Sequence, residues 1–217
     1  MVLASAEPVV LVVDDDLSVR KLIARLLEFA GYRVRTFISA EELLNTQLRP
    51  QIGCLMVDVH LPGLDGLALQ ERMLQQGTHL PVVFITGAGD IPTAVQAMKQ
   101  GAVDFLSKPL REETLLQAVK LAIERSRAEQ EIQAELAHLK RQYSRLTPRE
   151  VEVLGLVAAG KLNKQVAAEL GIAEKTVKIH RGRLMQKLHV HSVADLVRLY
   201  VKMAPPRQQS AQTDTGR

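Results

Sequence analysis

The sequence contains little of what disulfide-rich, membrane-spanning or secreted proteins require. It has one cysteine among 217 residues, which excludes an internal disulfide, and it has no tryptophan. The cysteine, Cys54, lies in an apolar run typical of a buried side chain. No segment approaches the roughly 18 consecutive apolar residues of a membrane-spanning helix. The start of the chain has no basic segment followed by a long apolar one, so it is not typical of a secretory signal. We therefore expect a cytoplasmic protein with no membrane partner.

Charge is distributed unevenly along the chain, although the net charge of +4 is modest. Residues 1–127 carry 13 Lys and Arg against 15 Asp and Glu, a net charge of −2, whereas residues 128–217 carry 15 against 9, a net charge of +6. A basic half that follows a nearly neutral half indicates that the C-terminal part of the chain binds a polyanion.

Residues 8–125 are predicted to form a doubly wound α/β domain. Short runs typical of strands alternate with helical patterns, and the runs at residues 9–13 and 53–57 are apolar on successive residues, which suits strands buried on both faces of a parallel sheet. Gly31 follows the first helical pattern in the position of a C-terminal cap. The five runs predict a five-stranded parallel sheet; they span residues 9–13, 33–37, 53–57, 82–85 and 103–106.

Polar side chains that suit a phosphate and Mg²⁺ site come after four of these runs. They are Asp14, Asp15 and Asp16 after the first run, Asp58 after the third, Thr86 after the fourth and Lys108 after the fifth. The carboxyl ends of parallel strands meet at the edge of the sheet where ligands bind, and clustered carboxylates suit Mg²⁺. Alone, the three aspartates fit a helix-capping cluster equally well, but the other three residues favour a site. Asp16 is interpreted as the cap.

The pattern stays helical from about Glu112, and residues 126–143 are predicted to form a helical linker. Apolar residues then recur at spacings of four, three, four and three, which is a short seam of the coiled-coil type; they are Ile132, Leu136, Leu139, Tyr143 and Leu146. Two interpretations stay open, a dimer seam and packing against the next domain.

Residues 144–203 are predicted to form an all-α domain of the helix-turn-helix type. Thr147 with Glu150 is a capping box for its first helix, and Asn163 is interpreted as the cap of its second. A turn at Gly171 then leads into a basic helix over residues 175–188, and helix, glycine-containing turn and basic helix together are the helix-turn-helix pattern. The tail, residues 204–217, is rich in small polar residues and is predicted to be disordered.

In order and spacing, these motifs resemble those of two-component response regulators, in particular the FixJ/NarL branch with a LuxR-type DNA-binding domain. The resemblance extends over residues 9–200. Its receiver motifs are VVDDD at residues 12–16, MVDVHLPGLDG at 56–66, ITGAGD at 85–90 and MKQGAVDFLSKP at 98–109, and its DNA-binding motifs are LTPREVEVL, NKQVAAELGI and KTVKIH.

The resemblance implies that Asp58 accepts a phosphoryl group from a sensor histidine kinase. Mg²⁺ would be held by Asp15, Asp58 and the backbone carbonyl of His60, and Asp14 would reach the ion through water.

The same resemblance implies roles for three further residues and a cis peptide bond. Lys108 would contact the phosphoryl oxygens, and the bond from Lys108 to Pro109 would be cis. Thr86 would hydrogen-bond the phosphoryl group, and Phe105 would rotate inward behind Thr86 as the switch aromatic residue.

In the C-terminal domain, the resemblance and the apolar stripe of the basic helix together indicate which residues are buried and which contact DNA. Val177, Leu184, Met185 and Leu188 would form the buried stripe. The residues expected at the DNA are Lys178, Ile179 and Arg181 in the major groove, Lys164, Lys175 and Thr176 at phosphates, and Arg183. Gly182 departs from the larger residue that many relatives carry. Phosphorylation would produce a homodimer that binds promoter DNA and works with RNA polymerase.

The sequence thus predicts a phosphorylation-controlled transcription factor and not an enzyme. A Mg²⁺-dependent phosphohydrolase is one alternative, but it would carry a second acid two residues after the nucleophile as its general acid, where this chain has His60. The other alternative is a phosphorylation-independent DNA-binding protein with a vestigial receiver domain. The complete set of acid, threonine and lysine positions argues against it.

Overall fold

The structure is a computed structural model that describes residues 8–47, 52–87 and 91–203. The chain divides into two compact units between Glu131 and Ile132, and each unit is described by itself. The tail over residues 204–217, which was predicted to be disordered, lies outside the described residues.

The first unit contains a five-stranded parallel sheet within the described residues, which confirms the predicted fold class. Its strands are β1 (Val9–Val13), β2 (Arg33–Phe37), β3 (Ile52–Asp58), β4 (Val82–Thr86) and β5 (Asp104–Ser107), and they lie in the order β2-β1-β3-β4-β5. Between and after the strands come helices α1 (Leu17–Phe29), α2 (Ala40–Leu44), α3 (Gly66–Gln75), α4 (Ile91–Lys99) and α5 (Glu112–Tyr143).

Strands β3 and β4 each end on a polar residue of the predicted site, one residue beyond their apolar runs. Asp58 pairs with Ile85 and Thr86 pairs with Ser107, so each is the last residue of its strand and not the first residue of the following loop. Backbone pairing in a parallel sheet does not depend on an apolar side chain. The sheet therefore fixes the backbone of both residues directly.

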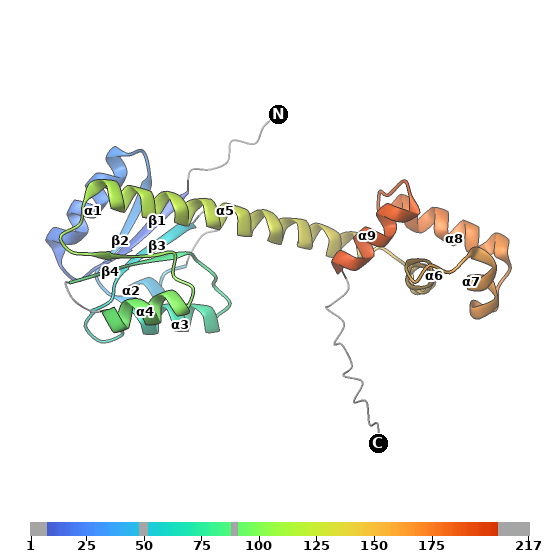
Figure 1. Cartoon of the computed structure of the whole chain (residues 1–217), viewed down its shortest axis with the longest axis horizontal. Helices are drawn as coiled ribbons and strands as arrows, with labels where there is room; N and C mark the ends of the chain where they lie inside the picture. Colours follow the sequence, from blue (N-terminus) through green and yellow to red (C-terminus); the bar gives the residue numbers. More distant parts are fainter. Residues whose placement is uncertain (1–7, 48–51, 88–90, 204–217) are drawn as a thin grey trace, which may run out of the picture. The chain divides into compact units, whose positions relative to one another are not determined.

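Apolar side chains cover both faces of the sheet, as expected for a doubly wound domain. Leu11, Leu55 and Val57 face a core that includes residues of α2, α3 and α4. Their neighbours along the same strands, such as Val12 and Met56, point to the other face of the sheet and pack in a second core formed with α1 and α5. Figure 1 shows these two groups of helices on opposite faces of the strands.

Helix α5 is continuous over 32 residues and includes the whole of the predicted linker. The seam predicted along its C-terminal half divides into two parts. Leu146 is buried in the core of the second unit and Tyr143 packs against that core, so packing within that unit accounts for these two residues. Leu139 is also buried. Ile132 and Leu136 are exposed, with 57% and 36% of their surface accessible.

Helices joined by short turns make up the described residues of the second unit, which begins at Ile132. It comprises the end of α5 and helices α6 (Pro148–Ala158), α7 (Asn163–Leu170), α8 (Glu174–Lys187) and α9 (Val193–Met203). The capping box of Thr147 and Glu150 opens α6 as predicted. Gly171 ends α7 with a positive φ of 65°, a conformation that glycine adopts without strain.

The predicted cap at Asn163 is wrong. Asn163 is the first residue of α7, and the side chain of Gln165 accepts the hydrogen bond from the backbone N–H of Leu162 instead, at 2.8 Å. The side-chain oxygen of Asn163 accepts a hydrogen bond from Arg181 of α8 at 3.1 Å. A contact between helices has therefore replaced the expected local cap.

Candidate functional site

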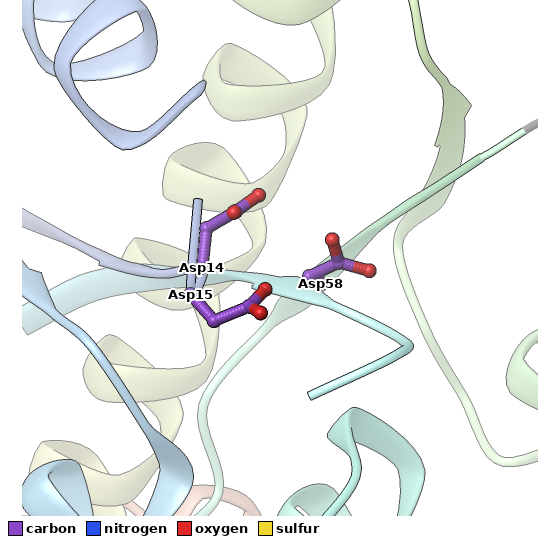
Figure 2. Close-up of side chains that lie close together, drawn as sticks. All are labelled: Asp14, Asp15 and Asp58. Atoms are coloured by element: carbon purple, nitrogen blue, oxygen red, sulfur yellow. The ribbon is translucent and has the colours of Figure 1, made fainter. Parts of the chain in front are cut away.

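The acidic residues predicted from the sequence come together at the carboxyl ends of β1 and β3. These strands are neighbours in register, with Val13 opposite Val57, so Asp14 and Asp58 emerge side by side. Ligand oxygens of Asp14, Asp15 and Asp58 lie within 4.8 Å of one another. Figure 2 shows the three carboxylates at these adjoining strand ends.

Lys108 joins this cluster from the loop after β5, which is separated from β3 by β4. Its Nζ atom donates to Oδ2 of Asp58 at 2.5 Å and to Oδ2 of Asp14 at 2.9 Å. The backbone N–H of Lys108 donates to the carbonyl of Thr86 at 2.7 Å, which ties the loop after β5 to the end of β4. The bond between Lys108 and Pro109 is cis, as the resemblance implies.

Backbone N–H groups orient the two buried carboxylates. Oδ1 of Asp14 accepts from the N–H of Asp16 at 2.8 Å, and Oδ1 of Asp58 accepts from the N–H of His60 at 2.9 Å. Each carboxylate is therefore held at one oxygen by the backbone and at the other by Lys108. Asp16 itself caps α1 by accepting from Ser18, in agreement with its interpretation as a helix cap.

Burial and the ion pairs act in opposite directions on the charges of the site. Burial raises the pKa of the Asp14 carboxyl above its ordinary value, although the hydrogen bond and charge of Lys108 oppose this. Burial alone would lower the pKa of Lys108, but hydrogen bonds to Asp58 and Asp14 raise it overall. Lys108 is thus held as a cation that partly neutralises a group of carboxylates.

The carboxylates form a donor set that fits a small divalent cation. Asp14, Asp15 and Asp58 offer hard oxygen ligands from a cluster that combines two buried carboxylates with the exposed carboxylate of Asp15. Such ligands suit Mg²⁺. The role expected of the His60 carbonyl stays a prediction.

Thr86 and Phe105 lie on the two strands beyond β3. Thr86 is only 1% exposed, and its hydroxyl has no hydrogen-bond partner among the described residues. A buried polar atom without a partner is uncommon and costs stability, so this hydroxyl is available to a group that enters the site. Phe105 pairs with Phe84 in the β4–β5 ladder and packs, partly buried, against the core that includes α4. Its predicted role as a switch is not tested by this packing.

Two residues that position the acids were missed by the sequence analysis. Arg20 is 8% exposed and its guanidinium donates to the carbonyl of Asp14 at 2.5 Å. Its place three residues before Ile23 and seven before Leu27, on the buried face of α1, was the available signal. The second is Gly66, where any side chain would overlap the carbonyl oxygen of Asp58.

The second unit presents a mixed basic and apolar face along α8. Most of the residues predicted to meet DNA are exposed, namely Lys164, Lys175, Lys178, Ile179 and Arg183, whereas Thr176 and Arg181 are partly buried. Val177, Leu184 and Leu188 are buried in the core as predicted, with Met185 packed beside them. Arg181 reaches Asn163 of α7, so its guanidinium is directed toward the N-terminus of that helix.

Lys187 shows that not every basic residue of α8 belongs to this face. Its Nζ atom donates to Oε2 of the buried Glu150 at 2.7 Å and to the carbonyl of Arg145 at 3.1 Å. Burial would raise the pKa of Glu150, but hydrogen bonds from Lys187 and from the backbone N–H of Thr147 lower it overall. Lys187 therefore stabilises the start of α6.

Across the described residues, no helix has the length and apolar character needed to cross a membrane.

Comparisons with known proteins cover both units. Residues 10–120 match the family model of the response regulator receiver domain, and residues 144–200 match that of the bacterial regulatory proteins of the luxR family. Nodulation protein W of Bradyrhizobium diazoefficiens is 48% identical over 210 residues, which are 97% of this chain and 92% of that protein.

The chain is also similar to FixJ and StyR along most of its length. The transcriptional regulatory protein FixJ of Bradyrhizobium diazoefficiens is 37% identical over 191 residues, 88% of this chain and 93% of that protein. The solved structure of the response regulator StyR is 46% identical, with a TM-score of 0.83, and the match covers 91% of this chain and 100% of that one.

Proposed function

Because the chain belongs to the two-component response regulators that join a receiver domain to a luxR-type DNA-binding domain, we propose that phosphorylation of Asp58 by a sensor histidine kinase controls its binding to promoter DNA. One observation carries this proposal. Lys108 bridges Asp58 and Asp14, and Thr86 at the end of the neighbouring strand β4 has a hydroxyl without a partner among the described residues, so a nucleophile, a cation and a hydroxyl meet at one edge of the sheet.

The geometry supports the following transfer. A carboxylate oxygen of Asp58 attacks the phosphorus of the kinase's phosphohistidine, the P–N bond breaks, and its electron pair returns to the imidazole. Lys108 turns from the two carboxylates toward the phosphoryl oxygens and stabilises their charge. The hydroxyl of Thr86 gains a hydrogen bond to the phosphoryl group. Mg²⁺, held by Asp15, Asp58 and the His60 carbonyl and reached by Asp14 through water, would further neutralise this charge.

The same site is poorly equipped for enzymatic phosphate release, so we propose a regulator and not an enzyme. A phosphohydrolase with an aspartate nucleophile needs a general acid two residues later. In such an enzyme that residue would be a second carboxylic acid, whereas this chain has His60 there.

The C-terminal domain is proposed to read DNA as a dimer. Two copies of α8 would lie in successive major grooves, so the operator would be an imperfect inverted repeat with half-sites about one helical turn apart. We further propose that phosphorylation drives this dimerisation, that the dimer works with RNA polymerase, and that the protein acts in the cytoplasm.

Labelling with a phosphoryl donor tests Asp58. Asp58→Asn should abolish the phosphoryl adduct seen by intact-protein mass spectrometry, because the amide has the shape of the carboxylate but is a poor nucleophile. Asp16→Asn is the matched control and should still be labelled, since asparagine caps a helix as well as aspartate does. A stoichiometric adduct on Asp58→Asn would contradict the assignment.

Binding titrations on cognate and scrambled duplexes at several salt concentrations test the DNA face. Lys178→Ala should weaken cognate binding by about 1–3 kcal/mol and flatten the preference at one base pair. Lys164→Ala should weaken binding to both duplexes alike and lower the salt dependence by about one contact. If both variants lose affinity equally on both duplexes, Lys178 does not read bases.

A further inference from the structure

Gly182 lies inside the recognition helix α8, where the backbone conformation does not require glycine. Glycine in a helix interior is less stable than alanine, and Gly182 lies more than one turn from either end of α8 (Glu174–Lys187). A glycine is required where φ is positive. Among the described glycines, those with positive φ are Gly31, Gly63, Gly77, Gly101, Gly160 and Gly171, and Gly182 is not one of them.

No contact within the described chain requires glycine at this position either. A Cβ atom built on Gly182 meets nothing within 4 Å. Gly66 is the opposite example, because a Cβ atom there would overlap the carbonyl of Asp58. Gly155 in α6 is intermediate, since its Cβ would lie 3.9 Å from the hydroxyl of Tyr200, an ordinary contact. The space at Gly182 is therefore free for something outside the chain.

The surroundings of Gly182 show what kind of group would fit there. Lys178 and Ile179 precede it by four and three residues, so they lie on the same side of the helix. All three are exposed, and Ile179 has 46% of its surface accessible. Gly182 thus leaves bare helix backbone with open space above it beside an apolar side chain, and Lys178 and Arg183 supply positive charge nearby.

We propose that Gly182 determines base specificity by letting the C5-methyl group of a thymine approach the helix backbone at this position. The inference rests on the DNA-binding function proposed above. An apolar side chain next to bare helix backbone cannot satisfy a phosphate or a base amino group, whereas the thymine methyl is the apolar feature of the major groove. A Cβ at residue 182 would occupy the space that the methyl group needs. Lys178 and Arg183 would hold the flanking groups.

Selection from a pool of random duplexes tests this with the full-length protein, treated with acetyl phosphate and untreated. The wild-type protein should enrich a motif with thymine at one fixed position in each half-site. Gly182→Ala should lose the preference at that position, keep the others and bind the wild-type motif about tenfold more weakly. Replacing that thymine by deoxyuridine should weaken wild-type binding about fourfold, the effect of one buried methyl group, and should not affect Gly182→Ala.

Stability separates this role from a structural one. Alanine favours the helix, so Gly182→Ala should raise the melting temperature while it lowers DNA affinity. Gly155→Ala is the matched control, which should keep both the motif and the affinity of the wild-type protein. Equal affinity and an unchanged motif for Gly182→Ala, or insensitivity of the wild-type protein to deoxyuridine, would overturn the inference. If the wild-type protein enriches no motif in either form, the proposed DNA-binding function itself fails.

Discussion

Replacing Thr86 by valine should stabilise the unphosphorylated receiver domain and impair its response to phosphorylation. The Thr86 hydroxyl is buried and has no hydrogen-bond partner among the described residues. Valine keeps the branched shape and replaces the hydroxyl by a methyl group. The variant therefore removes an unsatisfied polar atom from the resting state and the predicted phosphoryl ligand from the active one.

The expected size of the stabilisation follows from these two contributions. A buried polar group without a partner costs about 1–3 kcal/mol, and a buried methyl group contributes about 0.8 kcal/mol. Fitting the methyl into a packed site offsets part of this gain. We expect the free energy of unfolding to rise by about 1–2 kcal/mol, which corresponds to a melting temperature higher by roughly 4–8 °C.

Thermal and urea unfolding of the receiver domain in the full-length protein measure this change. Thr36→Val is the matched control, because Thr36 lies exposed on β2 and its substitution should change stability by no more than about 0.5 kcal/mol. Thr86→Ser keeps the hydroxyl and should be destabilised by about 1 kcal/mol, since it loses a buried methyl group. After treatment with a phosphoryl donor, Thr86→Val should carry the adduct on Asp58 but gain less DNA affinity than Thr86→Ser.

The reasoning is refuted if Thr86→Val is no more stable than the wild-type protein. That result would mean that the hydroxyl is already satisfied in the resting protein. A full gain of DNA affinity on phosphorylation of Thr86→Val would remove the hydroxyl from the signalling step.

Three further predictions concern positioning, stability and assembly. Arg20→Met keeps the bulk of the side chain but loses the hydrogen bond to Asp14, so Mg²⁺ affinity measured by calorimetry should fall about tenfold. Lys187→Met should destabilise the C-terminal domain by about 1–3 kcal/mol at pH 7 in urea unfolding, less than for a fully buried pair because Lys187 is 35% exposed. Because the pKa of Glu150 is lowered in the folded protein, this stabilisation is present above the ordinary value of 4.5 and is lost as the pH falls through the folded pKa. Phosphorylation should convert a monomer to a dimer in sedimentation at micromolar concentration.

Each of these predictions has a result that contradicts it. Unchanged Mg²⁺ affinity in Arg20→Met, with Arg20→Lys as the conservative comparison, would limit Arg20 to packing α1. A stability deficit in Lys187→Met that does not shrink below pH 4.5 would show that the loss is not due to the charge of Glu150. Identical sedimentation of the two forms would favour release of the domains over dimerisation as the response to phosphorylation.

Local patterns in the sequence were sufficient for the strands, the helices and the identity of the acids. The runs that became β1 and β4 are β-branched and apolar on successive residues, a pattern that only a strand buried on both faces explains. In a parallel sheet, residues at the carboxyl ends of such strands must share an edge. Asp14, Asp58 and Lys108 could therefore be predicted to meet although the last two are 50 residues apart.

The tertiary structure decided what no local pattern contains, namely which side chain contacts which and which is left without a partner. Arg20 lies on an apolar helix face, and only the packing of α1 beside β1 brings its guanidinium to the carbonyl of Asp14. Local rules made Asn163 a cap, but Arg181 competes for its oxygen from another helix.

The same distinction applies to exposure. Spacing alone put Ile132 and Leu139 on one seam, whereas in the structure Ile132 is exposed and Leu139 is buried. The empty space at Gly182 and the unpartnered hydroxyl of Thr86 are likewise properties of everything packed around them. Sequence periodicity specifies which face of an element is apolar, but the contacts of a side chain depend on segments far away in the chain, and only the folded structure brings those segments together.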